Sequence, residues 1–406
     1  MRLRPVAGKA MPSASAVIIQ LARLGDLVQS LPAYVGVLAR HPGGRVDILC
    51  PAVLAPLAHL FPGVGRVVPW DGGRWRAWSR RCGEHVPTAL EEGAQYVAAL
   101  APVPYDTAYN LNQHGRAVVL AHLLSRTVIG PGALGVLNET LPPWAAYVRE
   151  VARTRGANRV HLADAFCGLC GVRPPSAPPR LSVEGIELPD RFAGIGRSRG
   201  PWVAVVMGAG DVERTIPAPV WTSWIEQLLD RSPEGQVVLI GAGPETRVAH
   251  AVQDGLSSLH QGRVWDATGQ WSLPQLAAGL SRCHWVVGAD TGPLHLGAAV
   301  GVRAMGWYVA RARVHETGPY GAGHVVWQAE GGSVDGHARE VRRWPVVESV
   351  EWLLDGTAPV AAEGWTVWQS RFDEWGTTYA GATTNQEDAR RKVWTSLGWV
   401  GPEVHA

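Results

Sequence analysis

The chain has 406 residues, of which 46% are hydrophobic and 18% are charged, a composition typical of a globular protein. Its formal net charge of +2 at pH 7 gives no reason to expect nucleic-acid binding. No apolar run approaches the roughly 20 residues of a membrane-spanning helix, and the basic start lacks the apolar core of a signal peptide. At this length we expect two domains of ordinary size and a tail.

The cysteines give no sign of a disulfide framework, which favours a reducing cytoplasm. Cys167 and Cys170 form a Cys-x-x-Cys pair, as in zinc sites with two such pairs, but the sequence has no second pair. We therefore predict that both are small core residues of a helix, and we expect neither a metal nor a cofactor. Residues 1–14 are predicted to be a disordered leader.

In the N-terminal half, short strands alternate with helices. A first strand at residues 17–21 leads into a helix that begins near Asp26, is interrupted at Pro32 and resumes to about Arg40. Further strands are predicted at 45–50, 66–69, 105–110 and 127–130, and further helices at 53–60, 90–100, 116–124 and 159–171. This alternation predicts a parallel sheet covered on both faces, in a domain that spans residues 15–180.

A linker rich in Pro, Gly and Arg is predicted at 181–200, and a second α/β domain at 201–345. Its strands are predicted at 202–206, 236–240 and 285–287, and its helices at 220–230, 245–254, 272–280 and 293–300. Two doubly wound domains would place the carboxyl ends of both sheets at a shared cleft, where such folds bind their ligands.

The most informative stretch of the second domain is 285–296, which reads as a buried strand running directly into a helix. Gly288 and Gly292 permit tight turns, and Asp290 or Thr291 can cap the helix. Its N-terminus would present free N–H groups and a positive dipole end to a phosphate, with His295 as a further donor. An ordinary strand-to-helix turn with a capping aspartate is the alternative interpretation.

Three separated blocks carry a resemblance to a known family: residues 18–33, 241–245 and, most specifically, 288–299. Their order and spacing resemble glycosyltransferase family nine, the ADP-heptose:lipopolysaccharide heptosyltransferases, over roughly residues 15–350. The resemblance implies a GT-B fold, in which two Rossmann-like doubly wound domains face a cleft. It also implies that the acceptor binds the first domain and the nucleotide sugar the second.

Asp26 is similar to the proposed catalytic base of that family. It follows the first strand directly after Gly25, a residue that permits a sharp turn. Sugar transfer needs a base for the acceptor hydroxyl, and a carboxylate at the mouth of the cleft could provide one. The alternative is that Asp26 is an N-cap residue, worth ~1 kcal/mol of helix stability.

The resemblance also implies the donor site, made of Gly208, Ala209, Gly210, Arg214, Glu245, Asp290, Thr291, Gly292 and His295. Arg214 stands where the family usually has Lys, and Ala209-Gly210 where it usually has a hydroxyl residue, so those contacts differ. The sequence has no Asp-x-Asp motif, so we expect Arg214 and backbone N–H groups, rather than a metal, to neutralise the diphosphate. Each of these two residues also has an alternative interpretation: Arg214 could be a solvated loop residue, and Glu245 could only pair with the dipole of the helix that follows it.

On the acceptor side, Arg74, Arg76 and Arg116 are the candidate binding residues. The first two belong to residues 70–81, where Trp and Arg interleave. Such a segment suits a phosphorylated sugar, because faces of sugars stack on indoles and guanidinium groups bind phosphate. Contact with an anionic membrane surface, or a solvated linker with its Trp side chains in the core, are the alternatives.

The last part of the chain, 346–406, is predicted to be a helix followed by a Trp-rich tail. Five Trp residues after Gly356 make this tail too apolar for free disorder, and 385–397 has a helical pattern. We expect it to pack back on the body or to form an interaction surface.

The sequence therefore predicts an inverting, metal-independent glycosyltransferase that moves heptose from ADP-heptose to a lipopolysaccharide core or another bacterial surface glycan. Its partners would be a nucleotide-sugar donor and a glycan or lipid-linked glycan acceptor. The expected location is the cytoplasm, and peripheral contact with the inner face of the inner membrane is left open. One alternative is a different nucleotide sugar or acceptor. Another is a non-catalytic binding or scaffold protein whose site has drifted.

Overall fold

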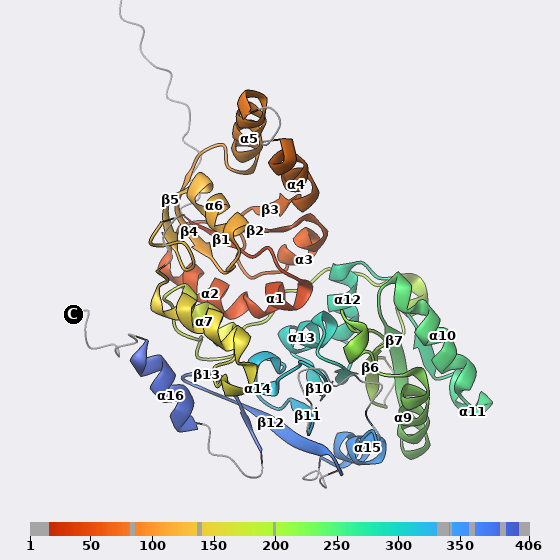
Figure 1. Ribbon diagram of the computed structural model, residues 1–406. Helices are drawn as coiled ribbons and strands as arrows, with labels where there is room; N and C mark the ends of the chain where they lie inside the picture. The colour runs from red at the N-terminus through yellow and green to blue at the C-terminus, as the bar shows by residue number, and fades with distance from the viewer. Residues whose placement is uncertain are drawn as a thin grey trace, which may run out of the picture.

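The computed structural model describes residues 16–81, 86–135, 140–197, 200–330, 341, 343–356, 362–381 and 387–397. The expected leader, 1–14, lies outside these residues. Two α/β domains lie one above the other in Figure 1, and the last elements of the chain run beneath both of them. The doubly wound, two-domain fold expected from the sequence is confirmed.

The N-terminal domain is built on a sheet of five parallel strands in the order β3-β2-β1-β4-β5. Its strands are β1 (Ala16–Ile19), β2 (Val46–Pro51), β3 (Val67–Trp70), β4 (Tyr105–Asn110) and β5 (Ser125–Ile129). Its helices are α1 (Leu24–Gln29), α2 (Leu31–Arg40), α3 (Ala55–Ala58), α4 (Gly72–Arg81), α5 (Val86–Leu100), α6 (Gly115–Leu124), α7 (Pro143–Arg153) and α8 (Leu162–Leu169). The expected break near Pro32 is present, because Pro32 lies in the first turn of α2, where a missing N–H is tolerated.

The C-terminal domain has an eight-stranded sheet in the order β13-β12-β11-β10-β9-β6-β7-β8. Its strands are β6 (Trp202–Val206), β7 (Gln236–Ile240), β8 (Val264–Asp266), β9 (Trp285–Gly288), β10 (Arg303–Tyr308), β11 (Val325–Ala329), β12 (Trp365–Asp373) and β13 (Gly376–Ala380). Its helices are α9 (Ala218–Arg231), α10 (Thr246–Gly255), α11 (Ser258–Gln261), α12 (Leu273–Leu280), α13 (Gly292–Ala299), α14 (Val314–Thr317) and α15 (Val346–Asp355). The strands from β6 to β11 are parallel, whereas β12 and β13 pair antiparallel.

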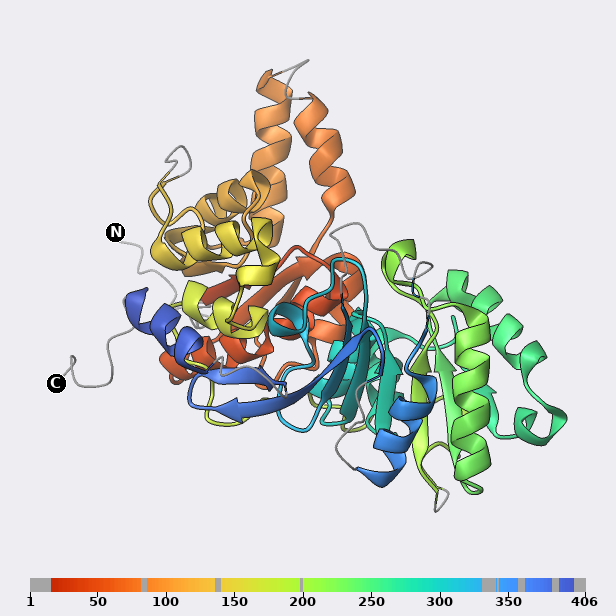
Figure 2. The same cartoon turned by 60° about the horizontal axis from the view of Figure 1, so that its bottom comes forward.

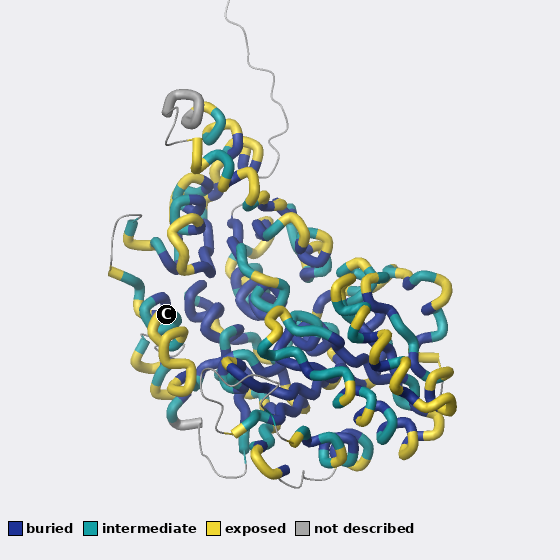
Figure 3. The backbone as a smooth tube through the Cα atoms, turned by 45° about the vertical axis from the view of Figure 1, so that its right-hand side comes forward, coloured by how far each residue is buried: buried dark blue, intermediate teal, exposed yellow. Residues whose placement is uncertain are grey.

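The central strands β1, β6 and β9 are buried along their whole length, and Figure 3 shows in dark blue that buried residues fill the interior of both domains. This burial follows from their Val- and Ile-rich sequences and from the helices that cover each side of a parallel sheet. No helix in the described ranges is both long and apolar enough to cross a membrane.

The tail contributes two strands that the sequence did not predict and a helix in the stretch, 385–397, where one was expected. Strands β12 and β13 extend the sheet of the C-terminal domain, and helix α16 (Glu387–Ser396) then crosses to the N-terminal domain, as Figure 2 shows in blue. There the fully buried Trp394 packs against Trp144 of α7, with their ring centroids 4.3 Å apart. The buried Arg390 donates to the carbonyl oxygen of Gly376 and pairs with Asp373.

A second link between the domains surrounds Asp164 of α8. Its carboxylate accepts hydrogen bonds from the Tyr320 hydroxyl at 2.7 Å and from the Thr377 N–H at 2.9 Å. Complete burial raises the pKa of Asp164 to about 8, against the opposing effect of the Tyr320 hydrogen bond. The His161 ring nitrogen Nε2 also lies 2.6 Å from the carbonyl oxygen of Gly318. Helix α8 is thus bound to segments of the C-terminal domain on the side where the tail crosses.

Candidate active site

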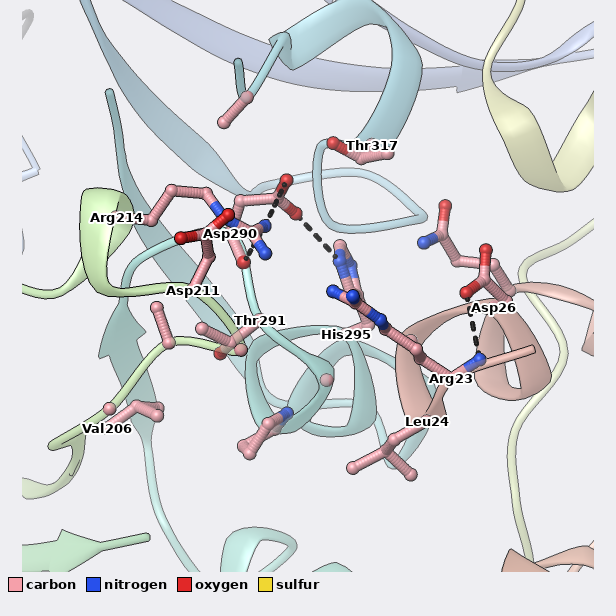
Figure 4. Close-up of a pocket in the computed structure, with 18 of the residues that line it drawn as sticks. Arg23, Leu24, Asp26, Val206, Asp211, Arg214, Asp290, Thr291, His295 and Thr317 are labelled. Carbon is pink, nitrogen blue, oxygen red and sulfur yellow. Dashed lines mark hydrogen bonds and ion pairs between the residues drawn. The ribbon is translucent and has the colours of Figure 1, made fainter. Parts of the chain in front are cut away.

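A cleft of about 780 Å³ separates the two domains. It is lined by the residues that follow β1 in the N-terminal domain and by those that follow β6, β7, β9 and β10 in the C-terminal domain. The carboxyl ends of both sheets therefore face one another across it, as expected for two doubly wound domains. Figure 4 shows the centre of this cleft, where Asp26 and Arg23 lie opposite Asp290 and Arg214.

The two domains approach closely beside the cleft because glycines lie at the contact between α1 and α13. A Cβ atom added to Gly292 would lie 2.7 Å from two side-chain atoms of Leu24. One added to Gly25 would lie 3.1 Å from the Cδ2 atom of His295. Both glycines belong to the sequence blocks that carry the family resemblance, and the structure gives them a packing role in addition to the turns expected of them.

Asp26 lies in the first turn of α1, and its side chain faces the cleft. The N-cap residue is Arg23 and not Asp26, but Asp26 does help to cap the helix: as the third residue of a capping box, its Oδ2 accepts a hydrogen bond from the Arg23 N–H at 3.2 Å. Burial raises the pKa of Asp26, although the Arg23 hydrogen bond and the charge of His295 oppose that rise. A carboxylate with a raised pKa is a stronger base than one on the surface.

On the opposite wall, Asp290 orients two cationic or protonatable side chains. The Arg214 Nη1 atom donates to the Asp290 carbonyl oxygen at 2.7 Å and to its Oδ2 at 3.2 Å. The Nε2 atom of His295 lies 3.2 Å from Asp290 Oδ1. Burial alone would raise the pKa of Asp290, but the hydrogen bond from His295 and the charges of His295 and Arg214 outweigh it and lower the pKa. Asp290 is therefore an ionised anchor, and the alternative interpretation of Arg214 as a solvated loop residue is wrong.

The start of α13 offers several donors without acceptors. Thr291 is at the N-cap position, yet its side chain makes no capping hydrogen bond, and its buried hydroxyl has no partner among the described residues. The first N–H groups of any α-helix lack acceptors within the helix. His295, 4% exposed, has a buried Nδ1 atom without a hydrogen-bond partner in the described chain, and this atom is a donor when the ring is protonated. These groups form a ready site for an anion that enters the cleft.

Glu245 lies farther along the cleft, at the turn between β7 and α10. Its side chain lies directly over Gly208, where a Cβ atom would clash with it, and a Cβ at Gly241 would lie 2.9 Å from its own Cβ. Glu245 makes no capping hydrogen bond for α10, and its buried Oε2 atom has no partner among the described residues. The carboxylate is therefore available to accept hydrogen bonds from a ligand.

Gly210 marks the point at which arginines of both domains converge. A Cβ at this position would lie 3.6 Å from Arg23 Nη1 and 3.8 Å from Arg214 Nη2. Arg23 reaches this point from the N-terminal domain, and Arg214 from the loop after β6. Ala209 lines the cleft beside Gly210 and offers only its backbone for polar contacts.

The structure also brings residues into the cleft that the sequence did not single out as site residues: Arg23, Arg155, Trp271, Arg311, Glu316 and Thr317. Arg23 could have been found, because it precedes Gly25-Asp26 within the first family block. Arg311 follows Ala310, which has a φ of 54°, a strained value for a residue other than glycine. Neither that backbone conformation nor the positions of Arg155 and Glu316 leave a signal in the local sequence.

The arginines expected to bind the acceptor do not line the cleft. Arg74 and Arg76 are exposed on α4, which forms with α5 the projecting hairpin at the top of Figure 1. The Arg74 guanidinium lies 5.0 Å from the centre of the Tyr96 ring. Arg116 is exposed near the start of α6 and does not line the cleft either. Their role in acceptor binding stays a prediction.

Two side-chain groups have the composition of metal sites. Cys167 and Cys170 are buried, and burial raises the pKa of both thiols, which fits their interpretation as core residues. On the surface of the C-terminal domain, Glu226 and Asp230 lie 2.8 Å and 3.1 Å from different ring nitrogens of His260. Because one ion cannot use both nitrogens of one imidazole, this geometry is that of a histidine held between two carboxylates.

Comparison with known proteins points in one direction. The model of glycosyltransferase family 9 (heptosyltransferase) matches residues 97–337. Lipopolysaccharide heptosyltransferase 2 of Escherichia coli strain K12 is 25% identical over 292 residues, which cover 68% of this chain and 77% of that protein. The solved E. coli ADP-heptose LPS heptosyltransferase II has a TM-score of 0.64 at 18% identity, over 84% of this chain and 97% of its own. E. coli heptosyltransferase WaaC with ADP has a TM-score of 0.61 at 20% identity, over 84% and 99%.

Proposed function

The chain belongs to glycosyltransferase family 9, the heptosyltransferases, and on that premise we propose that it moves heptose from ADP-heptose to a lipopolysaccharide core or a related bacterial surface glycan, with inversion at the anomeric carbon. The observation that carries the proposal is the position of Asp26 across the cleft from Arg214 and the N-terminus of α13. A base thus lies on one wall and anion-binding groups on the other.

In the proposed reaction, an acceptor hydroxyl enters from the N-terminal domain and loses its proton to the Asp26 carboxylate. Its oxygen forms a bond to the anomeric carbon of the sugar while the bond from that carbon to the diphosphate oxygen breaks. The electron pair of the broken bond leaves with ADP. The raised pKa of Asp26, which is caused chiefly by burial, favours uptake of this proton.

The leaving diphosphate carries negative charge that must be neutralised as the bond breaks. Arg214 and Arg23 converge at Gly210, and the Thr291 hydroxyl and the first N–H groups of α13 lie beside them. Because the sequence has no Asp-x-Asp motif, we assign this task to these protein groups and not to a metal. Arg214 in place of the family's usual Lys keeps the charge but offers a planar fork of donors.

The nucleoside would occupy the cleft beyond the diphosphate. Glu245 supplies a carboxylate oxygen suited to the ribose hydroxyls, and Trp271, Leu273 and Leu276 give an apolar surface near it for a base. The preference for ADP is supported by the names of the relatives, which refer to ADP and ADP-heptose.

Purified protein is expected to release ADP from ADP-heptose in the presence of a lipopolysaccharide-core acceptor, and to do so without added magnesium. Thermal unfolding with ADP, UDP, GDP and CDP, each with and without magnesium, identifies the nucleotide. A ligand at 100 times its Kd stabilises the folded state by about 2.7 kcal/mol, which raises the melting temperature measurably. A shift only with UDP or GDP would refute the ADP donor, and no shift with any nucleotide would refute a nucleotide-sugar site.

We further propose peripheral contact of the α4–α5 hairpin with an anionic membrane surface. Arg74, Arg76 and Arg80 are exposed on α4, whereas Trp75 on the same helix is buried against Trp70 and Tyr96. Arginines near an anionic bilayer each contribute about 1 kcal/mol to binding. The hairpin could thereby hold the enzyme where a lipid-linked acceptor lies.

Changing all three of these arginines to alanine is expected to reduce co-sedimentation with vesicles that contain anionic lipid by about 100-fold in partition coefficient. The matched control changes Arg126, Arg149 and Arg153, which are exposed but lie within 4 Å of acidic side chains. Equal binding by wild type, variant and control would show that the hairpin does not contact lipid. Both variants should retain the wild-type melting temperature.

A further inference from the structure

Glu316 is a buried acidic residue in the wall of the cleft. It belongs to α14, which follows the strained Ala310 and packs beside Asp290, and it is 8% exposed. Burial of a carboxylate costs free energy unless its oxygens receive hydrogen bonds, so a glutamate at this position does not serve stability. The position of this group therefore needs an explanation.

The carboxylate of Glu316 lacks hydrogen bonds that a ligand could supply. Its buried Oε2 atom has no hydrogen-bond partner among the described residues. Arg155 of the N-terminal domain forms an ion pair with it, but its Nε lies 3.6 Å from this oxygen, too far for a good hydrogen bond. Buried polar groups of native proteins are otherwise nearly always satisfied, so an orphan atom in a cleft wall points to an absent partner with donors to give.

Glu316 lies near the two aspartates of the cleft, Asp290 and Asp26. Glu245 packs over Gly208 in the loop after β6, on the nucleoside side. Glu316, by contrast, is close enough to Asp290 and Asp26 for their charges to affect its own pKa. The space between Asp26 and the diphosphate-binding groups is where the transferred sugar must lie if Asp26 acts as the base. Glu316 and Arg155 both line the cleft, and the charges of Asp290 and Asp26 act on Glu316.

We propose that Glu316 is a specificity-determining residue that accepts hydrogen bonds from hydroxyl groups of the transferred sugar, with Arg155 holding its carboxylate in place. The inference rests on the proposed function, and it adds a sugar-recognition residue that the sequence did not predict. A carboxylate can accept from two neighbouring hydroxyls at once, and an adjacent guanidinium can donate to their oxygens. The pair joins a residue of the N-terminal domain to one of the C-terminal domain at the wall of the cleft.

The surrounding charges agree with this assignment. Burial raises the pKa of Glu316 to about 7; Arg155 and Arg313 oppose that rise, and Asp290 and Asp26 add to it. In the empty cleft near pH 7 the carboxyl group is thus partly protonated. Hydroxyl donors favour the ionised form, so binding of the sugar should release part of that proton.

The test compares binding of ADP with binding of ADP-heptose by titration calorimetry. Wild type should bind ADP-heptose more tightly than ADP, whereas Glu316→Gln and Glu316→Ala should lose about 10- to 100-fold of affinity for ADP-heptose only. Affinity for ADP should stay within about twofold, which also shows that the cleft is intact. Glu184→Gln, on an exposed glutamate outside the cleft, is the matched control.

The same titrations in buffers of different ionisation enthalpy measure the released proton. Near pH 7 we expect wild type to release more protons on binding ADP-heptose than on binding ADP. In Glu316→Gln, the two ligands should release the same number of protons. Arg155→Lys should weaken ADP-heptose binding selectively, whereas Arg153→Lys on the preceding helix should not.

Each other outcome is decisive. Equal losses for ADP and ADP-heptose would mean that Glu316 merely holds the domains together, and unchanged affinities would mean that it does not touch the sugar; both overturn the inference. If wild type transfers heptose and the Glu316 variants have the same kcat/KM, the inference is overturned but the proposed function stands. Wild type that neither binds ADP-heptose nor transfers heptose would overturn the proposed function, and the inference with it.

Discussion

Asp26→Asn is expected to reduce kcat for sugar transfer by about 10²- to 10⁴-fold, the usual contribution of a general base. The asparagine side chain preserves shape and can still accept the hydrogen bond from the Arg23 N–H, but it cannot take a proton at neutral pH. Nucleotide affinity should be unchanged, because Asp26 lies across the cleft from Arg214 and Thr291. Turnover assays with ADP-heptose and calorimetry with ADP measure the two effects separately.

The same variant tests the sign of the pKa shift. Because the fold raises the pKa of Asp26 above its unfolded value, ionisation of this group weakens the folded state. The protonated carboxyl group of Asp26 therefore stabilises the fold relative to the ionised one. This stabilisation is fully present below the pKa of the unfolded state and is lost as the pH rises through the pKa of the folded state. At neutral pH, Asp26→Asn should therefore melt at the same temperature as wild type or higher, and the difference should vanish at acidic pH.

In wild type, kcat/KM should fall as the pH drops through the raised pKa of Asp26, since only the ionised carboxylate acts as a base. The control is Asp254→Asn, on an exposed residue of α10 that does not line the cleft. Turnover by Asp26→Asn at the wild-type rate would exclude Asp26 as the base.

Trp394→Ala is expected to lower the free energy of unfolding by about 3–5 kcal/mol, as for other buried large aromatic residues. Trp394 is fully buried, and its ring packs against Trp144 at 4.3 Å and Trp375 at 6.4 Å between centroids. Its loss would leave a cavity where α16 meets the N-terminal domain. Urea denaturation followed by Trp fluorescence measures the effect.

Lys392→Ala, on an exposed residue of the same helix, should change stability by no more than about 0.5 kcal/mol. A Trp394 variant as stable as wild type would mean that the tail packs on the body without stabilising it.

Several residues that line the cleft were predictable because their signals are local. The strand-to-helix turn at 288–292, the Gly-Asp pair after β1 and Glu245 after β7 each lie within a few residues of a strand end. A parallel sheet brings such ends together without any knowledge of the remaining chain. Ser272, at the start of the helix expected at 272–280, caps α12, since its side chain accepts from the Gln275 N–H.

The other part of the site depends on contacts between segments that are distant in sequence. Arg155 lies in a short turn after α7, and Glu316 in a four-residue helix, neither of which has an apolar period to detect. They meet only because the domains pack together. Likewise, β12 has a polar and exposed face, and its pairing with β11 and β13 makes it a strand.

The crossing of α16 to the N-terminal domain has a consequence for synthesis on the ribosome. Trp144 and its neighbours on α7 leave the ribosome long before Trp394, the ring that covers them. At about 5–20 residues per second, the roughly 250 intervening residues take about 12 to 50 s to make. Throughout that interval the nascent N-terminal domain carries a bare aromatic patch. Chaperones that hold apolar surface would therefore find a binding site on α7 that disappears when the last helix docks.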